Sequence, residues 1–147
     1  MCIRDSYTSL LPNLLVPELV NAIQRSRAPR LYICNLMTQP GETDGLDVRG
    51  HLRAIEAQLA SLGIEPRLFK AVLAQNDLVE SPLVQHYRAR GAEPVTCDAE
   101  GLRNDGYDVT QAPLQGARPT ATLRHDSRSL ALAVMRFYRS HRKERDQ

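Results

Sequence analysis

Hydrophobic positions along the 147-residue chain follow two spacings. Short apolar or β-branched runs predict strands at residues 30–36, 67–73 and 94–97. Elsewhere apolar residues recur every three or four positions, which predicts helices at residues 14–23, 47–63, 81–91 and from 126 onward. Strands separated by helices pair in parallel, because each helix returns the chain to the same end of the sheet. The pattern therefore predicts an α/β fold, a three-layer Rossmann-like unit with a mainly parallel sheet.

Local signals mark where these elements begin and end. Asp47 and Ser81 stand before two of the helices and can cap their first turns, and Asp126 or Ser127 can do so for the last helix. Gly63 follows the second predicted helix, as expected for a residue that ends one. The polar stretch 104–122 predicts a loop with at most one edge strand, at residues 107–109.

The pattern also predicts which side chains pack together. One face of the first helix should carry Leu15, Leu19, Val20 and Ile23. Three neighbouring parallel strands should contain Cys34, Val72 and Val95. Two helical stripes should cover the sheet: Leu52, Ile55 and Leu59, and Leu130, Val134 and Phe137.

The run from Asn35 to Thr43 is the most informative segment for function. It follows the first predicted strand and so lies at the carboxyl edge of the sheet, where open α/β sheets bind ligands. Glu42 offers an acceptor for ribose or sugar hydroxyls, and Gly41 leaves room for close backbone approach. Neutral hydrogen-bonding groups are supplied by Thr38, Gln39 and Thr43. An ordinary polar turn is the alternative interpretation.

Other candidate residues lie outside this run. Thr8 and Ser9 precede the first helix, where backbone amides can bind a phosphate; capping of that helix by Ser9 is the alternative. His51 lies in the first turns of the second helix and either reaches a ligand or is a solvated surface histidine. His125 beside Asp126 is interpreted as structural.

Composition narrows the function classes. The net charge of +2 comes from 19 Lys and Arg against 17 Asp and Glu, and we take it as scattered, which argues against a nucleic-acid or membrane-surface protein that binds through bulk positive charge. The longest apolar run, residues 130–135, is far shorter than the ~20 residues of a membrane span. Cys2, Cys34 and Cys97 lack disulfide or metal-site spacing, which favours a reducing cytoplasm. No catalytic residue, metal ligand or cofactor is assigned.

Two runs of sequence resemble the gluconeogenesis factor family, the YvcK-like branch of the CofD-like superfamily. They are residues 7–16 and residues 32–43, and the ungapped part from Asn35 to Thr43 is strongly specific. His51 stands where that family often has a histidine at the start of a helix. The segment 123–126, Leu-Arg-His-Asp, resembles the closing segment of the family.

The N-terminus departs from the family pattern. Family members carry Gly-Pro-Gly-Ser-Leu before the first run, preceded by an N-terminal half that opens with a glycine-rich phosphate loop. We interpret residues 1–6 as an unrelated leader or a sequence artefact, residues 7–140 as the C-terminal half of the family's domain, and residues 141–147 as a charged tail that frays. The expected sheet is then incomplete because the N-terminal half is missing, and that half is an expected partner.

The resemblance implies a cytoplasmic regulator that binds a nucleotide-sugar, UDP-N-acetylglucosamine in the best-known members. Such a regulator links gluconeogenic carbon metabolism to cell-wall synthesis and cell shape. A 2-phospho-L-lactate transferase-like enzyme, as in the superfamily's transferase branch, is one alternative, and an inert truncated fragment is another. Whether the chain forms a homo-oligomer is left open.

The resemblance also implies roles for the candidate residues. Thr8, Ser9 and Asn13 would face the phosphates. The rest of the cleft wall would be formed by Asn35, Thr38, Gln39, Gly41, Glu42 and Thr43, with His51 beside them. Without the glycine-rich turn, this wall predicts no UDP-N-acetylglucosamine binding tighter than roughly millimolar by the 147-residue chain.

Overall fold

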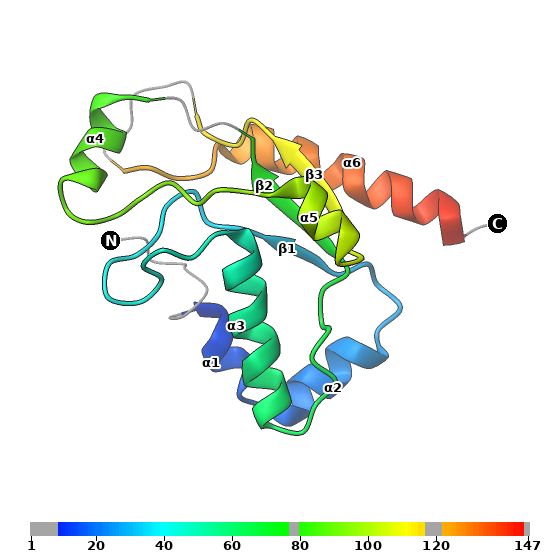
Figure 1. The fold of residues 1–147 in the computed structure, drawn as a ribbon. Helices are drawn as coiled ribbons and strands as arrows, with labels where there is room; N and C mark the ends of the chain where they lie inside the picture. The colour runs from blue at the N-terminus through cyan, green and yellow to red at the C-terminus, as the bar shows by residue number, and fades with distance from the viewer. Residues whose placement is uncertain (1–8, 77–79, 117–121, 146–147) are drawn as a thin grey trace.

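A three-stranded parallel sheet forms the centre of the protein (Figure 1). The computed structural model describes residues 9–76, 80–116 and 122–145. The strands lie side by side in the order β1 (Leu31–Ile33), β2 (Ala71–Gln75) and β3 (Asp108–Ala112). Val72 pairs with Tyr32 on one side and with Val109 on the other, both in parallel. The predicted parallel α/β sheet is confirmed.

Helices pack on both faces of this sheet, which makes three layers (Figure 1). One face is covered by α1 (Leu11–Leu14), α2 (Pro17–Arg25), α3 (Val48–Ser61) and α5 (Ala99–Asn104). The other face is covered by α4 (Pro82–Arg88) and α6 (Ser127–Arg145). None of the helices in the described part of the chain combines the length and apolarity that crossing a membrane requires.

Alternating side chains of the strands build two hydrophobic cores, because successive residues of a strand point to opposite faces. The first core joins Tyr32, Val72 and Val109 to the predicted α3 stripe of Leu52, Ile55 and Leu59. The second core joins Leu31, Ile33 and Leu73 to α4 and to Leu130 and Val134 of α6. The predicted α3 stripe therefore packs as expected, as do Leu130 and Val134 of the α6 stripe, and Phe137 is buried.

Polar side chains cap three helices as the sequence predicts. Asp47 accepts a hydrogen bond from the Gly50 amide at 2.7 Å, at the start of α3. The Ser81 hydroxyl accepts from the Val84 amide at 3.2 Å, at the start of α4. Asp126, rather than Ser127, caps α6 by accepting from the Ser129 amide at 2.8 Å. These caps fix where the helices begin, and with them the loops that precede the helices.

The third strand of the sheet is β3, which confirms the edge strand expected at residues 107–109, whereas the strand predicted at residues 94–97 is wrong. Val95 is not in the sheet; its amide donates to the Leu36 carbonyl at 3.0 Å, and Pro94 forms an isolated antiparallel bridge with Met37. The segment 94–97 therefore packs against the chain that leaves β1, and Val109 takes the expected place beside Val72. Cys34 likewise follows β1 directly instead of lying inside it.

Both chain ends differ from expectation. The predicted first helix is broken at residues 15–16 into α1 and α2, which turns its apolar face. Val20 is fully buried, but Leu15 and Leu19 are 51% and 40% exposed, so their predicted place in the core is wrong. At the other end, α6 continues to Arg145, through residues that we expected in a charged tail.

Candidate functional site

A cavity of about 390 Å³ opens beyond the carboxyl end of β1. Its volume falls in the range of ordinary small-molecule sites, roughly 300–1,000 Å³. Three segments that are distant in the sequence form its walls. The lining residues are 35–40 after β1, His86, Tyr87, Arg90 and Ala92 on and after α4, and residues 122–125 before α6. The cavity thus lies at the sheet edge that the sequence predicts.

The wall after β1 is held by two buried threonines. The amide of Glu93 donates to the Thr38 hydroxyl oxygen at 2.8 Å, and the Thr38 amide donates back to the Glu93 carbonyl at 2.7 Å. The Thr43 hydroxyl oxygen accepts from the Gln39 amide at 2.7 Å. These contacts satisfy backbone groups that a loop would otherwise leave unpaired. Both threonine oxygens therefore shape the wall.

Gln39 has an unused acceptor at this wall. Its Oε1 atom is buried and accepts no hydrogen bond from the described residues. A buried acceptor without a partner is costly by about 1–3 kcal/mol. A ligand that donates a hydrogen bond to Gln39 would remove that cost. Asn35 lines the same wall and adds a second amide side chain.

The α4 wall is aromatic and basic. The half-buried Tyr87 accepts from the Leu123 amide at 3.4 Å, a long contact that links this wall to the segment before α6. The His86 ring lies edge-on to the Tyr87 ring, with centroids 6.4 Å apart. Arg90 follows α4 and lines the cavity from the same side. Together they offer flat ring surfaces and one positive charge.

The wall before α6 is tied to the ends of two strands. His125 donates from Nε2 to the Cys34 carbonyl at 3.1 Å, which links it to the end of β1. Gln75, the last residue of β2, accepts through Oε1 from the Leu114 amide at 2.6 Å and the Gln115 amide at 2.9 Å. Gln115 then pairs with His125 in an isolated antiparallel bridge. The position of this wall is thus set by the sheet.

Burial tunes two groups in this wall. It lowers the pKa of His125, and the hydrogen bond to the Cys34 carbonyl opposes that shift. A neutral His125 that donates from Nε2 keeps Nδ1 as an acceptor. Burial also raises the pKa of the Cys34 thiol to about 12, so this thiol is a poor nucleophile and only its carbonyl takes part.

Two exposed arginines give the lining of the cavity a positive charge. Arg90 and Arg124 line it, and within the described part of the chain neither forms an ion pair. The lining contains no Asp or Glu among the described residues. By contrast Arg88, the last residue of α4 and two positions before Arg90, is paired with Glu80 at 3.1 Å and with Glu93 at 3.3 Å. The two lining arginines can therefore compensate the charge of an anionic group such as a phosphate.

The structure brings only part of the predicted site to the cavity. Of the candidates, Asn35, Thr38 and Gln39 line it. Gly41 and Glu42 lie in the exposed part of the loop, where the Gly41 amide donates to Asp44 at 2.6 Å. Thr43 lies behind the lining and holds the Gln39 backbone.

The N-terminal candidates and His51 lie elsewhere. Asn13 is exposed and donates to the Ser9 carbonyl at 2.6 Å, and Thr8 lies outside the described residues. The N-cap of α1 is Leu10, so capping by Ser9 is wrong. His51 is fully buried and donates from Nδ1 to the Asp47 carbonyl at 2.8 Å, so the solvated-surface alternative is also wrong.

The sequence analysis missed the lining residues that carry the aromatic and charged chemistry of the cavity: His86, Tyr87, Arg90, Arg124 and His125. Tyr87 is part of an apolar stripe and Arg90 is one arginine among many, so neither carries a local signal. Arg124 and His125 did carry one, because the segment 123–126 resembles the closing segment of the family. We interpreted this segment as a helix cap, which is correct for Asp126. For that reason Arg124 and His125 were not assigned to a binding site.

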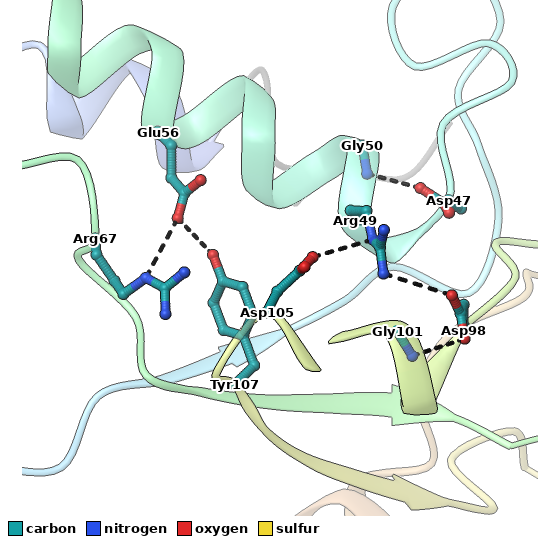
Figure 2. Close-up of polar contacts among 9 residues, drawn as sticks. All are labelled: Asp47, Arg49, Gly50, Glu56, Arg67, Asp98, Gly101, Asp105 and Tyr107. Atoms are coloured by element: carbon teal, nitrogen blue, oxygen red, sulfur yellow. Dashed lines mark hydrogen bonds and ion pairs between the residues drawn. The ribbon is translucent and has the colours of Figure 1, made fainter. Parts of the chain in front are cut away.

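A second polar region, the paired cluster, lies away from the cavity and none of its residues lines it (Figure 2). It consists of Arg49, Glu56, Arg67, Asp98, Asp105 and Tyr107. Arg49 of α3 reaches Asp98 at 3.4 Å and Asp105 at 3.3 Å, one at each end of α5. Asp98 also caps α5 by accepting from the Gly101 amide at 2.9 Å. These contacts join α3 to α5.

Tyr107 joins the rest of the paired cluster (Figure 2). It directly precedes β3 and donates its hydroxyl hydrogen to the Glu56 carboxylate of α3. Arg67 lies 4.0 Å from the same carboxylate, and its guanidinium lies 4.6 Å from the Tyr107 ring centroid. Burial, and then the Glu56 contact, raise the pKa of Tyr107. The cluster therefore connects α3 to the start of β3.

Comparisons with known proteins agree with this fold. A family model described as "2-phospho-L-lactate transferase CofD" matches residues 1–115. The chain is 39% identical over 132 residues to a protein of Nostoc sp., covering 90% of the chain and 28% of that protein. It is 31% identical to the "Gluconeogenesis factor" of Bacillus subtilis, covering 85% of the chain and 38% of the relative.

A solved structure gives the same result. The crystal structure of a UPF0052 family member from Bacillus halodurans superimposes with a TM-score of 0.75 at 35% identity, covering 88% of this chain and 39% of that one. The chain thus spans between about a quarter and two fifths of the length of these relatives.

Proposed function

The chain belongs to the CofD family, and we propose that its cavity binds the phosphates and sugar of a nucleotide-sugar, with UDP-N-acetylglucosamine as the candidate ligand. The observation that carries the proposal is the pair Arg90 and Arg124, which line one cavity and have no ion-pair partner in the described part of the chain. A nucleotide-sugar carries two phosphates, and arginine binds phosphate oxygens through paired N–H donors.

The other lining groups complement the rest of such a ligand. Tyr87 and His86 offer ring faces on which a base or the apolar face of a sugar can stack. Gln39 has a free buried acceptor, and Asn35 provides an amide for sugar hydroxyls or for the base. Recognition would then be by hydrogen bonds, charge and stacking, with no covalent step.

The proposal assigns the candidate residues to two groups. Asn35, Thr38 and Gln39 contact the ligand, because they line the cavity. Thr43 acts indirectly by holding the Gln39 amide. Ser9, Asn13, Gly41, Glu42 and His51 lie outside the lining and are not part of the proposed contacts.

The wider role is proposed from the relatives. The Bacillus subtilis relative is named a gluconeogenesis factor, which supports a role in gluconeogenic carbon metabolism. From the family resemblance of the sequence alone, we further propose a cytoplasmic regulator that connects this metabolism with cell-wall synthesis and cell shape. The relatives are more than twice as long as the chain, so other parts of the longer protein would complete the site. The isolated chain should therefore bind only weakly, with a dissociation constant of about 1 mM or higher.

A nuclear magnetic resonance titration of the 147-residue chain with UDP-N-acetylglucosamine tests the proposal. Amide shifts should be confined to residues 35–40, 86–92 and 122–125. Arg124→Ala and Arg90→Ala should each weaken binding about tenfold or more, since a hydrogen bond to a charged group contributes about 1.5–3 kcal/mol.

The matched control is Arg88→Ala, on the same helix as Tyr87. Its guanidinium is paired with Glu80 and Glu93, and Arg88 does not line the cavity, so the affinity should not change. Amide shifts centred outside the cavity segments would show that the ligand does not bind in the cavity. Equal affinity in Arg88→Ala, Arg90→Ala and Arg124→Ala would show the same. Saturable micromolar binding would show that the chain carries the whole site.

A second candidate function follows from the description of the matching family model, 2-phospho-L-lactate transferase. Incubation with a guanylyl-phospholactate donor and a deazaflavin acceptor tests it, and product formation would put it ahead of the regulator. An inert truncated fragment is the third hypothesis. It would be supported by a chain that unfolds without a cooperative transition and shows no localised shifts on titration.

A further inference from the structure

The charge of the chain is concentrated in its last helix. Within α6, residues 127–145, there are six Lys and Arg residues and one Glu. The rest of the chain has 13 basic and 16 acidic residues. The net charge of +2 therefore combines a strongly basic helix with a mildly acidic remainder. Our expectation of scattered charge is wrong for this helix.

Helix α6 has two faces of different character. The inner face joins the second core through Leu130, Ala133 and Val134, and Phe137 is also buried. The outer face exposes three large apolar side chains: Leu132 at 52%, Met135 at 46% and Tyr138 at 45%. Exposed arginines accompany them on this face, namely Arg128, Arg136 and Arg139. We call these six residues the α6 outer face.

The helix is also accessible. Its C-terminal half extends past the sheet and the other helices in Figure 1. Tyr138 and Arg139 lie on this half, whereas Leu132 and Met135 lie before it. All four side chains are exposed, so they are open to contact in the described structure. Scattered single apolar residues on a surface need no explanation, but three on one face of a basic helix form a patch with both apolar and cationic chemistry.

We propose that the α6 outer face docks on an anionic lipid bilayer. A helix that carries apolar residues among arginines can lie in the plane of the interface. Leu132 and Met135 would then enter the acyl boundary, and Tyr138 would lie at the headgroup level, where tyrosine is enriched. The arginines would stay with the lipid phosphates, because their stems can pass along the apolar layer. This inference does not depend on the ligand of the cavity.

Charge favours a bilayer over a second copy of the chain and over a nucleic acid. The other parts of the longer protein are a third occupant, and loss of vesicle binding in the longer protein would assign the face to them. A second copy of the chain would bring the arginines of two α6 outer faces together, and like charges in contact oppose association. A nucleic acid would pair with the arginines, but exposed leucine and methionine gain nothing from a phosphate backbone. An anionic membrane matches both the cationic and the apolar residues of this face.

Vesicle co-sedimentation of the 147-residue chain tests the proposal. The chain should bind vesicles of phosphatidylglycerol and phosphatidylcholine and bind pure phosphatidylcholine at least tenfold more weakly. Binding should also weaken as ionic strength rises, because salt screens surface charge. Arg136→Glu with Arg139→Glu should lower the affinity by more than tenfold, since each arginine near the surface contributes about fivefold. Leu132→Ser with Met135→Ser should lower it by a similar factor.

Matched controls use exposed residues outside α6. Arg25→Glu with Arg53→Glu removes the same charge from α2 and α3, and Leu15→Ser with Leu19→Ser removes exposed apolar groups from the turn between α1 and α2 and from α2 itself. Both should bind vesicles within about twofold of the unmodified chain.

Four results would overturn the proposal. They are no binding to anionic vesicles at low salt, equal binding to neutral vesicles, equal losses in the control variants, and a dimer in sedimentation equilibrium that the α6 substitutions dissociate. Tighter binding to DNA than to vesicles would likewise assign the face to a nucleic acid. Because the lipid and salt comparisons use the unmodified chain, they decide the matter even where a variant folds poorly.

Discussion

The paired cluster and the cavity both contain arginines and other polar residues, but in the described part of the chain the arginine charges are paired only in the paired cluster. In the paired cluster every arginine has a carboxylate partner: Arg49 has two and Arg67 has one (Figure 2). In the cavity, Arg90 and Arg124 have none among the described residues, and Gln39 has a buried oxygen without a donor. The charges of Arg49 and Arg67 are compensated within the paired cluster, although the buried Nε of Arg49 makes no hydrogen bond among the described residues. The charges of Arg90 and Arg124 in the cavity remain available to a ligand.

This difference shows that a count of polar groups does not locate a binding site. Half-exposed ion pairs contribute only about 0–1 kcal/mol each, so the paired cluster mainly fixes how α3, α5 and β3 meet. An uncompensated cation in a cavity contributes nothing to the fold, but it can stabilise an incoming anion by more. What separates the two regions is whether each charge is already compensated.

The largest expected effect concerns the tyrosine of each region. Tyr107→Ala should lower the free energy of unfolding by about 3–5 kcal/mol, because it removes a buried ring together with its contact to Glu56. Tyr87→Ala should cost only about 1 kcal/mol, since Tyr87 is half-buried and its hydroxyl contact is long. Urea denaturation measures both. Equal losses would show that the cavity is as much a structural element as the paired cluster.

A smaller effect is expected where the cavity wall meets the sheet. Gln75→Leu should destabilise the protein by about 1–3 kcal/mol, because the amides of Leu114 and Gln115 lose their acceptor. It should also weaken ligand binding, since Arg124 lies on the chain segment that these contacts hold. Gln75→Glu keeps an oxygen in this place and should recover much of the affinity. A loss of stability with unchanged affinity would show that the wall does not depend on Gln75.

The sharpest comparison uses one arginine from each region. Arg49→Ala should lower the free energy of unfolding by about 1 kcal/mol and leave ligand affinity unchanged, because it breaks two ion pairs away from the cavity. Arg124→Ala should change stability by less than about 0.5 kcal/mol while weakening the ligand. Calorimetric titration measures the ligand affinity of each variant, and thermal unfolding measures its stability. If both variants lose stability, or both lose ligand affinity, the paired cluster and the cavity do not have the separate roles proposed here.

Much of the fold could be predicted because local signals agreed with packing. The α3 stripe of Leu52, Ile55 and Leu59 has helical spacing, a capping aspartate before it and a glycine after it, and it packs as expected. The third strand was misplaced because residues 94–97 are as apolar and β-branched as a strand. In β3 only Val109 is well buried, so the sequence indicates no more than a short edge strand at residues 107–109 within a polar loop. Whether residues 94–97 or β3 join the sheet depends on pairing with β2, and the periodicity of the sequence does not show pairing.

The candidate site was half predictable for a related reason. The wall at residues 35–39 directly follows a strand, so topology alone places it at the carboxyl edge. Arg90 and Arg124 come from segments 50 or more residues later, and only the folded structure shows that they face the same cavity. His51 was misjudged because a histidine in a first helical turn can be exposed or buried with equal local sequence.

The smallest expected effect is a loss of stability at low pH that begins in the cavity wall and not in the paired cluster. Burial lowers the pKa of His125 below its ordinary value of 6.5. Above that value His125 is neutral in both the folded and the unfolded chain, and it adds no pH dependence. As the pH falls below 6.5, the unfolded chain takes up the proton first, so the folded state loses stability until the folded pKa is reached.

The variant His125→Gln has no group that titrates at this position, so its stability should fall less than that of the unmodified chain between pH 7 and pH 5. Because the difference arises where His125 holds the cavity wall to the Cys34 carbonyl, the lost stability should appear first in that wall. Residues 122–125 should broaden in nuclear magnetic resonance spectra at a higher pH than Tyr107 does. If the free energy of unfolding of the two proteins changes equally between pH 7 and pH 5, His125 is not a pH-sensitive support of the cavity.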